Sequence, residues 1–89
     1  MNENKRGRIV VGYRFLMANP ESVLRLFSEI GFLPIRVEHD MFCDVVEYAG
    51  YSEAFRELSE NERIPAYRIM FRAGENREIE KCWVEETKE

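Results

Sequence analysis

The stretch Ala66-Tyr-Arg-Ile-Met-Phe-Arg72 is followed by a Gly-Glu-Asn turn and by a second strand-like segment, Arg77 to Glu86. This pattern predicts a β-hairpin. Successive side chains of a strand point to opposite faces of a sheet. One face of the first strand then suits a core: Tyr67, Ile69 and Phe71. The other face is rich in arginine, which is unusual for an acidic protein: Arg68, Met70 and Arg72.

Upstream of this hairpin, the chain predicts a strand and then a helix. Alternating apolar residues predict the strand over Arg8 to Met17. Asn19 is a favourable N-cap and Pro20 suits the first helical position. Residues at helical spacing form the expected buried stripe: Val23, Leu24, Phe27 and Ile30. Gly31 can end the helix in the left-handed conformation, which folds Phe32 back towards Phe27.

The middle of the chain predicts a second hairpin. Its first strand, Leu33 to Glu38, would turn three residues inward: Leu33, Ile35 and Val37. His39-Asp40 would form the turn, and Met41 to Ala49 the next strand. The facing of that strand stays open, because Phe42, Val46 and Tyr48 compete with Met41, Cys43 and Val45.

A short second helix is expected over Ser52 to Glu60. Ser52 would cap it, and Arg56 and Glu60 would form an i,i+4 pair. The inward side chains would be Ala54, Phe55 and Leu58.

These elements predict an α+β fold with a mostly antiparallel sheet, in the order β-α-β-β-α-β-β, and one or two helices packed on one face. The order is compatible with a split βαβ (ferredoxin-like) arrangement that carries an added C-terminal strand. The alternative is one curved antiparallel sheet around the first helix. A single domain is expected over residues 8–86, between a frayed N-terminal tail, 1–7, and a C-terminal tail, 87–89.

The length, composition and charge of the chain narrow the classes of protein to which it is expected to belong. The 89 residues are 45% hydrophobic and 34% charged, which is typical of a soluble globular protein. In a chain this short, a deep catalytic cleft is hard to build without a partner subunit. No apolar run approaches the length of a membrane span, and no signal-peptide stretch occurs, so a cytoplasmic protein is expected (the host cytoplasm if the chain is viral). A net charge of −4 disfavours nucleic acid. Cys43 and Cys82 are expected to be buried thiols that could be neighbours in the sheet.

The arginine-rich face is the best candidate site. Arginine, methionine and tryptophan are enriched at the centres of protein interfaces. On the sheet face away from the helices, the expected binding residues are Arg14, Arg36, Arg68, Met70, Arg72 and Trp83. Val84 would take the place of Trp83 if the register of the last strand were shifted. The alternative is a solvated ladder in which glutamates pair with these arginines across strands. RNA binding is disfavoured, because the strand aromatics are expected to face inward and no RNA-recognition motif is present.

Catalytic and metal-binding patterns are weak. His39, Asp40, Cys43, Asp44 and Glu47 are all possible metal ligands, but one histidine and no ligand pair do not make a site. Cys43 and His39 have no third group to orient them as nucleophile and base. No metal, cofactor or catalytic residue is therefore expected.

The sequence predicts a small non-enzymatic interaction protein, a regulatory subunit or an inhibitor. It is expected to bind another protein, or itself as a homo-oligomer, through the arginine-rich sheet face. By composition, such chains are common among phage and accessory gene products that block host proteins. The alternative is a binder of a small anion or nucleotide, held by arginines at a subunit boundary.

Overall fold

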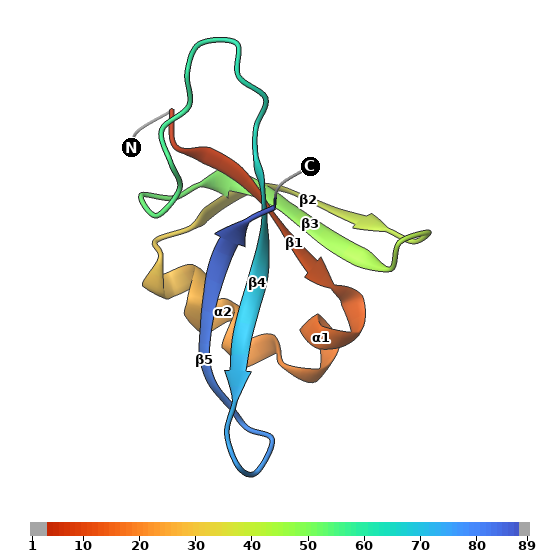
Figure 1. Cartoon of the computed structure of the whole chain (residues 1–89). Coiled ribbons are helices and arrows are strands. Elements are labelled where there is room, and N and C mark those ends of the chain that lie inside the picture. The colour runs from red at the N-terminus through yellow and green to blue at the C-terminus, as the bar shows by residue number, and fades with distance from the viewer. Residues whose placement is uncertain (1–3, 88–89) are drawn as a thin grey trace.

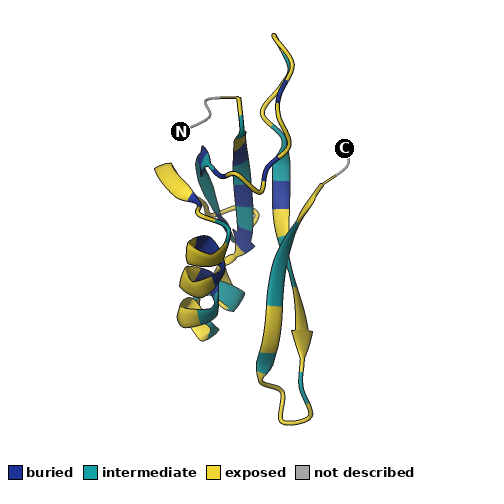
Figure 2. Ribbon diagram, turned by 90° about the vertical axis from the view of Figure 1, so that its left-hand side faces the viewer, coloured by how far each residue is buried: buried dark blue, intermediate teal, exposed yellow. Residues whose placement is uncertain are grey.

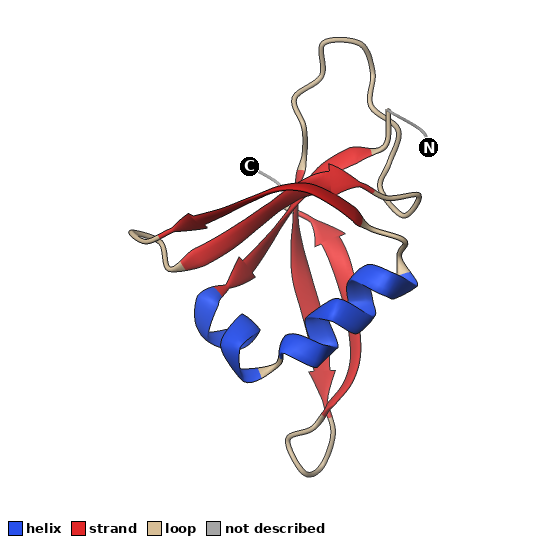
Figure 3. Cartoon of the chain, turned by 180° about the vertical axis from the view of Figure 1, so that it is seen from behind, coloured by secondary structure: helices blue, strands red, loops and turns tan. Residues whose placement is uncertain are grey.

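The computed structural model describes residues 4–87 and shows an α+β fold of two helices and a five-stranded sheet (Figure 1). The elements, in chain order, are β1 (Arg6–Gly12), α1 (Tyr13–Ala18), α2 (Pro20–Glu29), β2 (Leu33–Asp40), β3 (Val45–Tyr51), β4 (Ala66–Ala73) and β5 (Ile79–Glu86). Both helices lie on one face of the sheet (Figure 3). We call the other face the open face.

The sheet is mixed, so the expectation of a mostly antiparallel sheet is wrong. The strand order is β2-β3-β1-β4-β5, and β1 pairs with β4 in parallel. The cause is the segment between β3 and β4. β3 ends at Tyr51 opposite Arg6, and β4 begins at Ala66 beside Arg8, so both lie at the same end of β1. Because no helix carries the chain to the far end, β4 must run parallel to β1. The split βαβ relationship stays a prediction.

The expected first strand ends early, and its second half forms α1. The amide of Tyr13 still donates to the carbonyl of Asp44 (2.9 Å), and the helix then begins. Leu16, Met17 and Ala18 have high helix propensity, while the alternation of Phe15 and Met17 also fitted a strand. In the helix, Phe15 and Leu16 pack against the core. The local sequence of residues 13–18 fits either a strand or a helix, and packing against the core selects the helix.

Helix α2 follows the sequence closely, with two corrections. Pro20 occupies its first turn and Gly31 has a φ of 62°. The amide of Phe32 donates to the carbonyl of Phe27 (2.8 Å), and the two rings meet edge to face, as expected. The Asn19 side chain, however, donates back to the carbonyl of Phe15 instead of capping α2. The buried stripe contains Leu26, while Leu24 is 66% exposed.

The β2–β3 hairpin is shifted along the chain, and its first strand is exposed instead of buried as expected. His39 and Asp40 belong to β2, and the turn is 41–44. All of β2 is exposed, including the residues expected inward: Leu33, Ile35 and Val37. β2 is an edge strand, and α2 packs towards β5 at the other edge, so neither helix in the described part of the chain covers β2. In β3, Val46 and Tyr48 face the helices and Val45 faces away. This settles which set of side chains in this strand points inward.

The core lies between the two helices and the middle of the sheet (Figure 2). The buried core cluster is Ile9, Val11, Val23, Phe27, Phe32, Phe55 and Tyr67. The inward residues of the C-terminal hairpin are mostly as expected, since Tyr67 is buried and Ile69 packs on this cluster. Phe71 is half exposed and meets the ring of Phe15 at 5.0 Å.

The expected helix at Ser52 to Glu60 is not formed, and the segment is an irregular loop. The Ser52 hydroxyl donates to the carbonyl of Ile30 (2.6 Å), and the amide of Leu58 donates to the carbonyl of Asn4 (2.8 Å). Phe55 and Leu58 are both buried. A nine-residue helix is marginal alone, and here the two apolar side chains and the N-terminal segment hold the backbone in another shape.

An arginine holds the outer part of this loop. Arg56 contacts Glu62 (2.5 Å) and Glu86 (2.6 Å), in place of the expected pair with Glu60. These carboxylates raise the pKa of Arg56. The amide of Ser59 donates to Glu62, and this bond together with Arg56 lowers the pKa of Glu62 below its ordinary 4.5. The charged form of Glu62 is therefore the one that stabilises the loop.

Residues 1–3 and 88–89 of the expected tails lie outside the described residues. Within the described part, Arg6 and Gly7 belong to β1, and the carbonyl of Lys5 accepts the amide of Ser52. The amide of Thr87 donates to the carbonyl of Ala66, which extends the pairing of the last two strands.

We predict that Gly31→Ala lowers the free energy of unfolding by about 1–2 kcal/mol, because a side chain in the left-handed conformation is strained. Urea unfolding measures this value. Gly12→Ala is the matched control, since Gly12 has φ −59° and ψ 133° and an added Cβ meets nothing within 4 Å. Equal effects of the two changes would contradict the assigned helix end.

We predict that the 52–65 loop loosens as the pH falls from 6 to 3. The pKa of Glu62 is lowered by folding, so its contribution is present above the unfolded pKa and is lost as the pH falls through the folded one. Hydrogen exchange of the Arg56 and Leu58 amides, corrected for intrinsic rates, measures this change. Glu62→Gln should remove the pH dependence and Glu60→Gln should keep it. Unchanged protection at pH 3 in the wild type would refute the mechanism.

Candidate functional site: the open sheet face

Strand register places four of the expected binding residues together on the open face. Paired residues of neighbouring strands point to the same face. Met70 pairs with Trp83, Arg68 with Glu85, and Arg72 with Lys81. Because Ile69 and Val84 pack against the helix-side core, the alternate residues of β4 and β5 face away from it. The C-terminal hairpin therefore presents Arg68, Met70, Arg72 and Trp83 on one surface.

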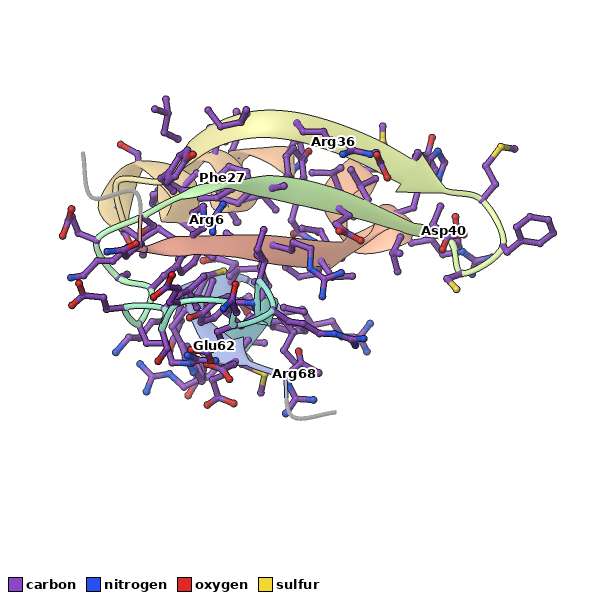
Figure 4. All side chains as sticks on the ribbon, turned by 90° about the horizontal axis from the view of Figure 1, so that it is seen from above. Arg6, Phe27, Arg36, Asp40, Glu62 and Arg68 are labelled. Carbon is purple, nitrogen blue, oxygen red and sulfur yellow. The ribbon has the colours of Figure 1, made fainter. Side chains whose placement is uncertain are left out.

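Arg36 lies on the same face but three strands away. Register links the two positions, since Arg68 pairs with Val10, Val10 with Glu47, and Glu47 with Glu38, two residues from Arg36. Figure 4 shows Arg36 on the edge strand β2 and Arg68 towards the opposite edge of the sheet. Arg14 lies in α1 and belongs to no strand, so its expected place on the sheet face is wrong. It was misplaced because the strand was expected to continue to Met17.

The centre of the hairpin surface is apolar. Met70 and Trp83 face each other across strands and both are half-buried. The Trp83 indole N–H donates to Glu85 (3.2 Å), and the Lys81 ammonium lies 6.0 Å from the indole ring. No helix lies on this face among residues 4–87. A half-buried tryptophan and a half-buried methionine thus lie side by side among charged side chains.

The arginines of the open face already have carboxylate neighbours. Arg68 lies 3.9 Å from Glu85 and Arg72 lies 3.3 Å from Glu80, both in exposed positions. Arg36 forms an ion pair with Glu38 on its own strand. Exposed pairs of this kind contribute about 0–1 kcal/mol each. The alternative expectation, that glutamates pair with these arginines in a solvated ladder, therefore also describes this face. These ion pairs are weak enough to be exchanged for ion pairs with a partner.

One ion pair on this face, which the sequence did not single out, is partly buried. Arg8 of β1 donates to Glu47 of β3 (3.4 Å), and both side chains are about one-third exposed (34%). The Arg8 Nε is buried and has no hydrogen-bond partner among the described residues. A shallow depression beside this pair is lined by Arg8, Arg36, Glu38, Glu47, Ala49 and Ile64. The carbonyl of Pro65 accepts the N–H of Arg8, which fixes the end of the 52–65 loop beside β1. Ile64 therefore reaches the depression.

The residues considered as metal ligands have structural roles in the β2–β3 turn. The Asp40 carboxylate accepts the amides of Phe42 (3.0 Å) and Cys43 (3.2 Å), which lowers its pKa. His39 stacks on Tyr13 and lies 3.9 Å from Asp44. Within residues 4–87, no three possible ligands converge on one point. The turn is held by a side chain that mimics a backbone carbonyl.

Neither cysteine is placed as a reactive group. The hydrogen bond and negative charge of Asp40 raise the pKa of the Cys43 thiol, which is the opposite of what a nucleophile needs. Cys43 is exposed in the turn, so the expectation that it is buried is wrong. Cys82 is in β5 at the other edge of the sheet, so the two thiols are not neighbours. Burial raises the pKa of Cys82.

Neither helix in the described part of the chain has the length and apolarity required to cross a membrane. Comparison of the whole chain with protein-family models, with curated proteins and with solved structures finds no match.

We predict different costs for the two kinds of ion pair on the open face. Arg68→Gln should change the free energy of unfolding by less than about 1 kcal/mol, because its pair is exposed. Glu47→Gln should cost about 1–2 kcal/mol, because it leaves the partly buried charge of Arg8 with a weaker acceptor. Urea unfolding of both variants checks this order. A larger cost for Arg68→Gln would show that the exposed ladder holds the fold together.

Proposed function

We propose that this chain is a small non-enzymatic protein-binding module, a regulatory subunit or inhibitor, that takes its partner on the open face of the C-terminal hairpin. The observation that carries the proposal is the half-buried cross-strand pair of Met70 and Trp83 between Arg68 and Arg72, on the face without a helix. Such a centre combines a rigid aromatic anchor with guanidinium groups that can take bidentate contacts.

The charges support a protein partner. The exposed ion pairs of Arg68 and Arg72 can be replaced by carboxylates of a partner at little cost, which favours orientation and selectivity over raw affinity. A net charge of −4 disfavours nucleic acid on the same surface. The strand aromatic Tyr67 is buried on the other face and cannot stack on a base.

The second candidate, a small anionic ligand, has one supporting observation. Arg8 and Arg36 line the same depression on the open face. Glu38 and Glu47 also line it, however, and each is within ion-pair distance of one of these arginines. An anion would have to displace or approach two carboxylates. The ligand proposal therefore has less support than the protein-binding proposal.

We predict that Arg68→Glu/Arg72→Glu abolishes partner binding and leaves the fold intact. The tagged protein is used to capture partners from lysate of its source organism after nuclease treatment, and bound proteins are quantified by mass spectrometry. Arg25→Glu/Arg63→Glu is the control, because it makes the same charge change outside the hairpin surface. Circular dichroism verifies the fold of each variant. Equal capture of one stoichiometric protein by the wild type and the Arg68→Glu/Arg72→Glu variant would refute the proposed surface.

A thermal-shift series with nucleotides and inorganic phosphate at millimolar concentration separates the two candidates. A ligand that binds the folded state raises the melting temperature. A rise that Arg36→Gln removes would support the anion site instead of the protein-binding surface.

A further inference from the structure

The two edge strands, β5 and β2, both carry charged residues, but only β2 also has large exposed apolar side chains. The edge strand β5 carries charged residues along its length: Glu80, Lys81, Glu85 and Glu86. Such charges discourage another strand from adding to the sheet. The other edge strand, β2, is exposed over all its residues and carries Leu33 (43% exposed), Ile35 (65%) and Val37 (55%). An exposed edge with apolar side chains is a template for a further strand.

The charges of β2 are arranged for pairing with themselves. Arg36 and Glu38 lie on either side of Val37 and point to the open face. If two copies of β2 run antiparallel about a two-fold axis at Val37, Arg36 of each copy lies opposite Glu38 of the other. Each arginine already pairs with the glutamate of its own strand. The axis therefore gathers two arginines and two glutamates in alternation, a favourable cross-strand arrangement.

Axes centred on the charged residues or on His39 set like charges opposite each other, and an axis at Ile35 sets Arg36 opposite Pro34, with no charged partner. An axis at Arg36 places the two arginines together, and an axis at Glu38 places the two glutamates together. An axis at His39 places Glu38 opposite Asp40. Parallel pairing in register places every charge opposite its own copy. Like charges directly opposite each other destabilise a strand pair, so the two-fold at Val37 is the arrangement that the sequence of β2 favours.

The same axis covers the apolar residues of the hairpin. Val37 packs on Val37 of the second copy, and Ile35 lies opposite His39. The turn of each copy, with Met41 (82% exposed) and the fully exposed Phe42, extends alongside the start of β2 of the other, at Leu33. The bulge at Ile35 and the missing N–H of Pro34 limit the ladder to about five residues, 35–39.

We propose that the protein forms a two-fold homodimer by antiparallel pairing of β2 with β2 of a second copy, which joins the two five-stranded sheets into one. The chemistry of recognition is backbone hydrogen bonding along the edge, with the Arg36–Glu38 exchange setting the register. The inference is independent of the proposed function, because the hairpin surface with Met70 and Trp83 is formed by β4 and β5, and β5 is the edge strand opposite β2.

Charge reversal tests the register. The mass in solution is measured by light scattering and sedimentation equilibrium from 5 to 500 µM, against a monomer of 10.6 kDa. The wild type should approach twice this mass. Arg36→Glu places glutamate opposite glutamate twice, and Glu38→Arg places arginine opposite arginine twice. Each should weaken dimerisation at least tenfold. Both side chains are exposed, so the fold should be retained, as circular dichroism verifies.

Two rescue experiments make the test specific to the proposed axis. The double variant Arg36→Glu/Glu38→Arg restores opposite charges and should recover the dimer. An equimolar mixture of the two single variants should form a heterodimer, because the chain with two glutamates then faces the chain with two arginines. A merely structural effect of either substitution would not be rescued by mixing.

The controls separate this proposal from the proposed function. Lys81→Glu on the other edge and Arg68→Glu/Arg72→Glu on the hairpin surface should both leave the dimer intact. A wild type that stays monomeric at 500 µM would overturn the dimer. A dimer that survives Arg36→Glu but is lost with Arg68→Glu/Arg72→Glu would overturn the β2 edge and assign self-association to the open face of the hairpin.

Discussion

The stacking of Phe55 on Tyr67 is the contact on which the rest of the sheet depends. The two rings lie nearly parallel with centroids 4.3 Å apart, and both are almost fully buried. They fit because Gly7 has no side chain, since a Cβ there would lie 2.8 Å from the Tyr67 ring and 2.9 Å from the Phe55 ring. This contact fixes the 52–65 loop at one end of β1. It holds the loop at the end of β1 where β4 begins, and β4 pairs with β1 in parallel from there.

The position of the candidate site is a consequence of the same contact. With β4 parallel to β1, its odd-numbered residues from Tyr67 to Phe71 turn towards the helices and Arg68, Met70 and Arg72 turn away. β5 then adds at the edge and places Trp83 beside Met70. The surface is built from side chains of two neighbouring strands in a hairpin, so its internal geometry needs no long-range contact. Its distance from Arg36, by contrast, is set by the strand order of the whole sheet.

Local signals in the sequence were sufficient where structure is local. The helix over Pro20–Glu29 has its proline and its left-handed glycine at its ends, and the C-terminal hairpin has an unambiguous alternation. Local signals failed where packing decides. Alternating apolar residues at Tyr13–Ala18 fit both a strand and a helix. Phe55 and Leu58 have helical spacing but are inserted into the core from a loop. The exposure of β2 depends on where the helices lie, which its own residues do not encode. For the site, the alternation of side chains was enough to identify the hairpin residues. Arg14 was misplaced because β1 ends before it and α1 begins. The Arg8–Glu47 pair was missed because it depends on the pairing of β1 with β3, which the local sequence does not show.

The place of β1 in the sheet has a consequence for how the chain folds during synthesis. β1 leaves the ribosome before the other strands of this sheet, yet it is the central strand, with β3 on one side and β4 on the other. Its second neighbour is made only when most of the chain has been translated, and contacts between such distant segments form slowly. Until then, one edge of a strand with Ile9 and Val11 has no partner. The N-terminal half therefore exposes an apolar strand edge for the time it takes to synthesise the rest of the sheet, and unpaired edges of this kind favour aggregation.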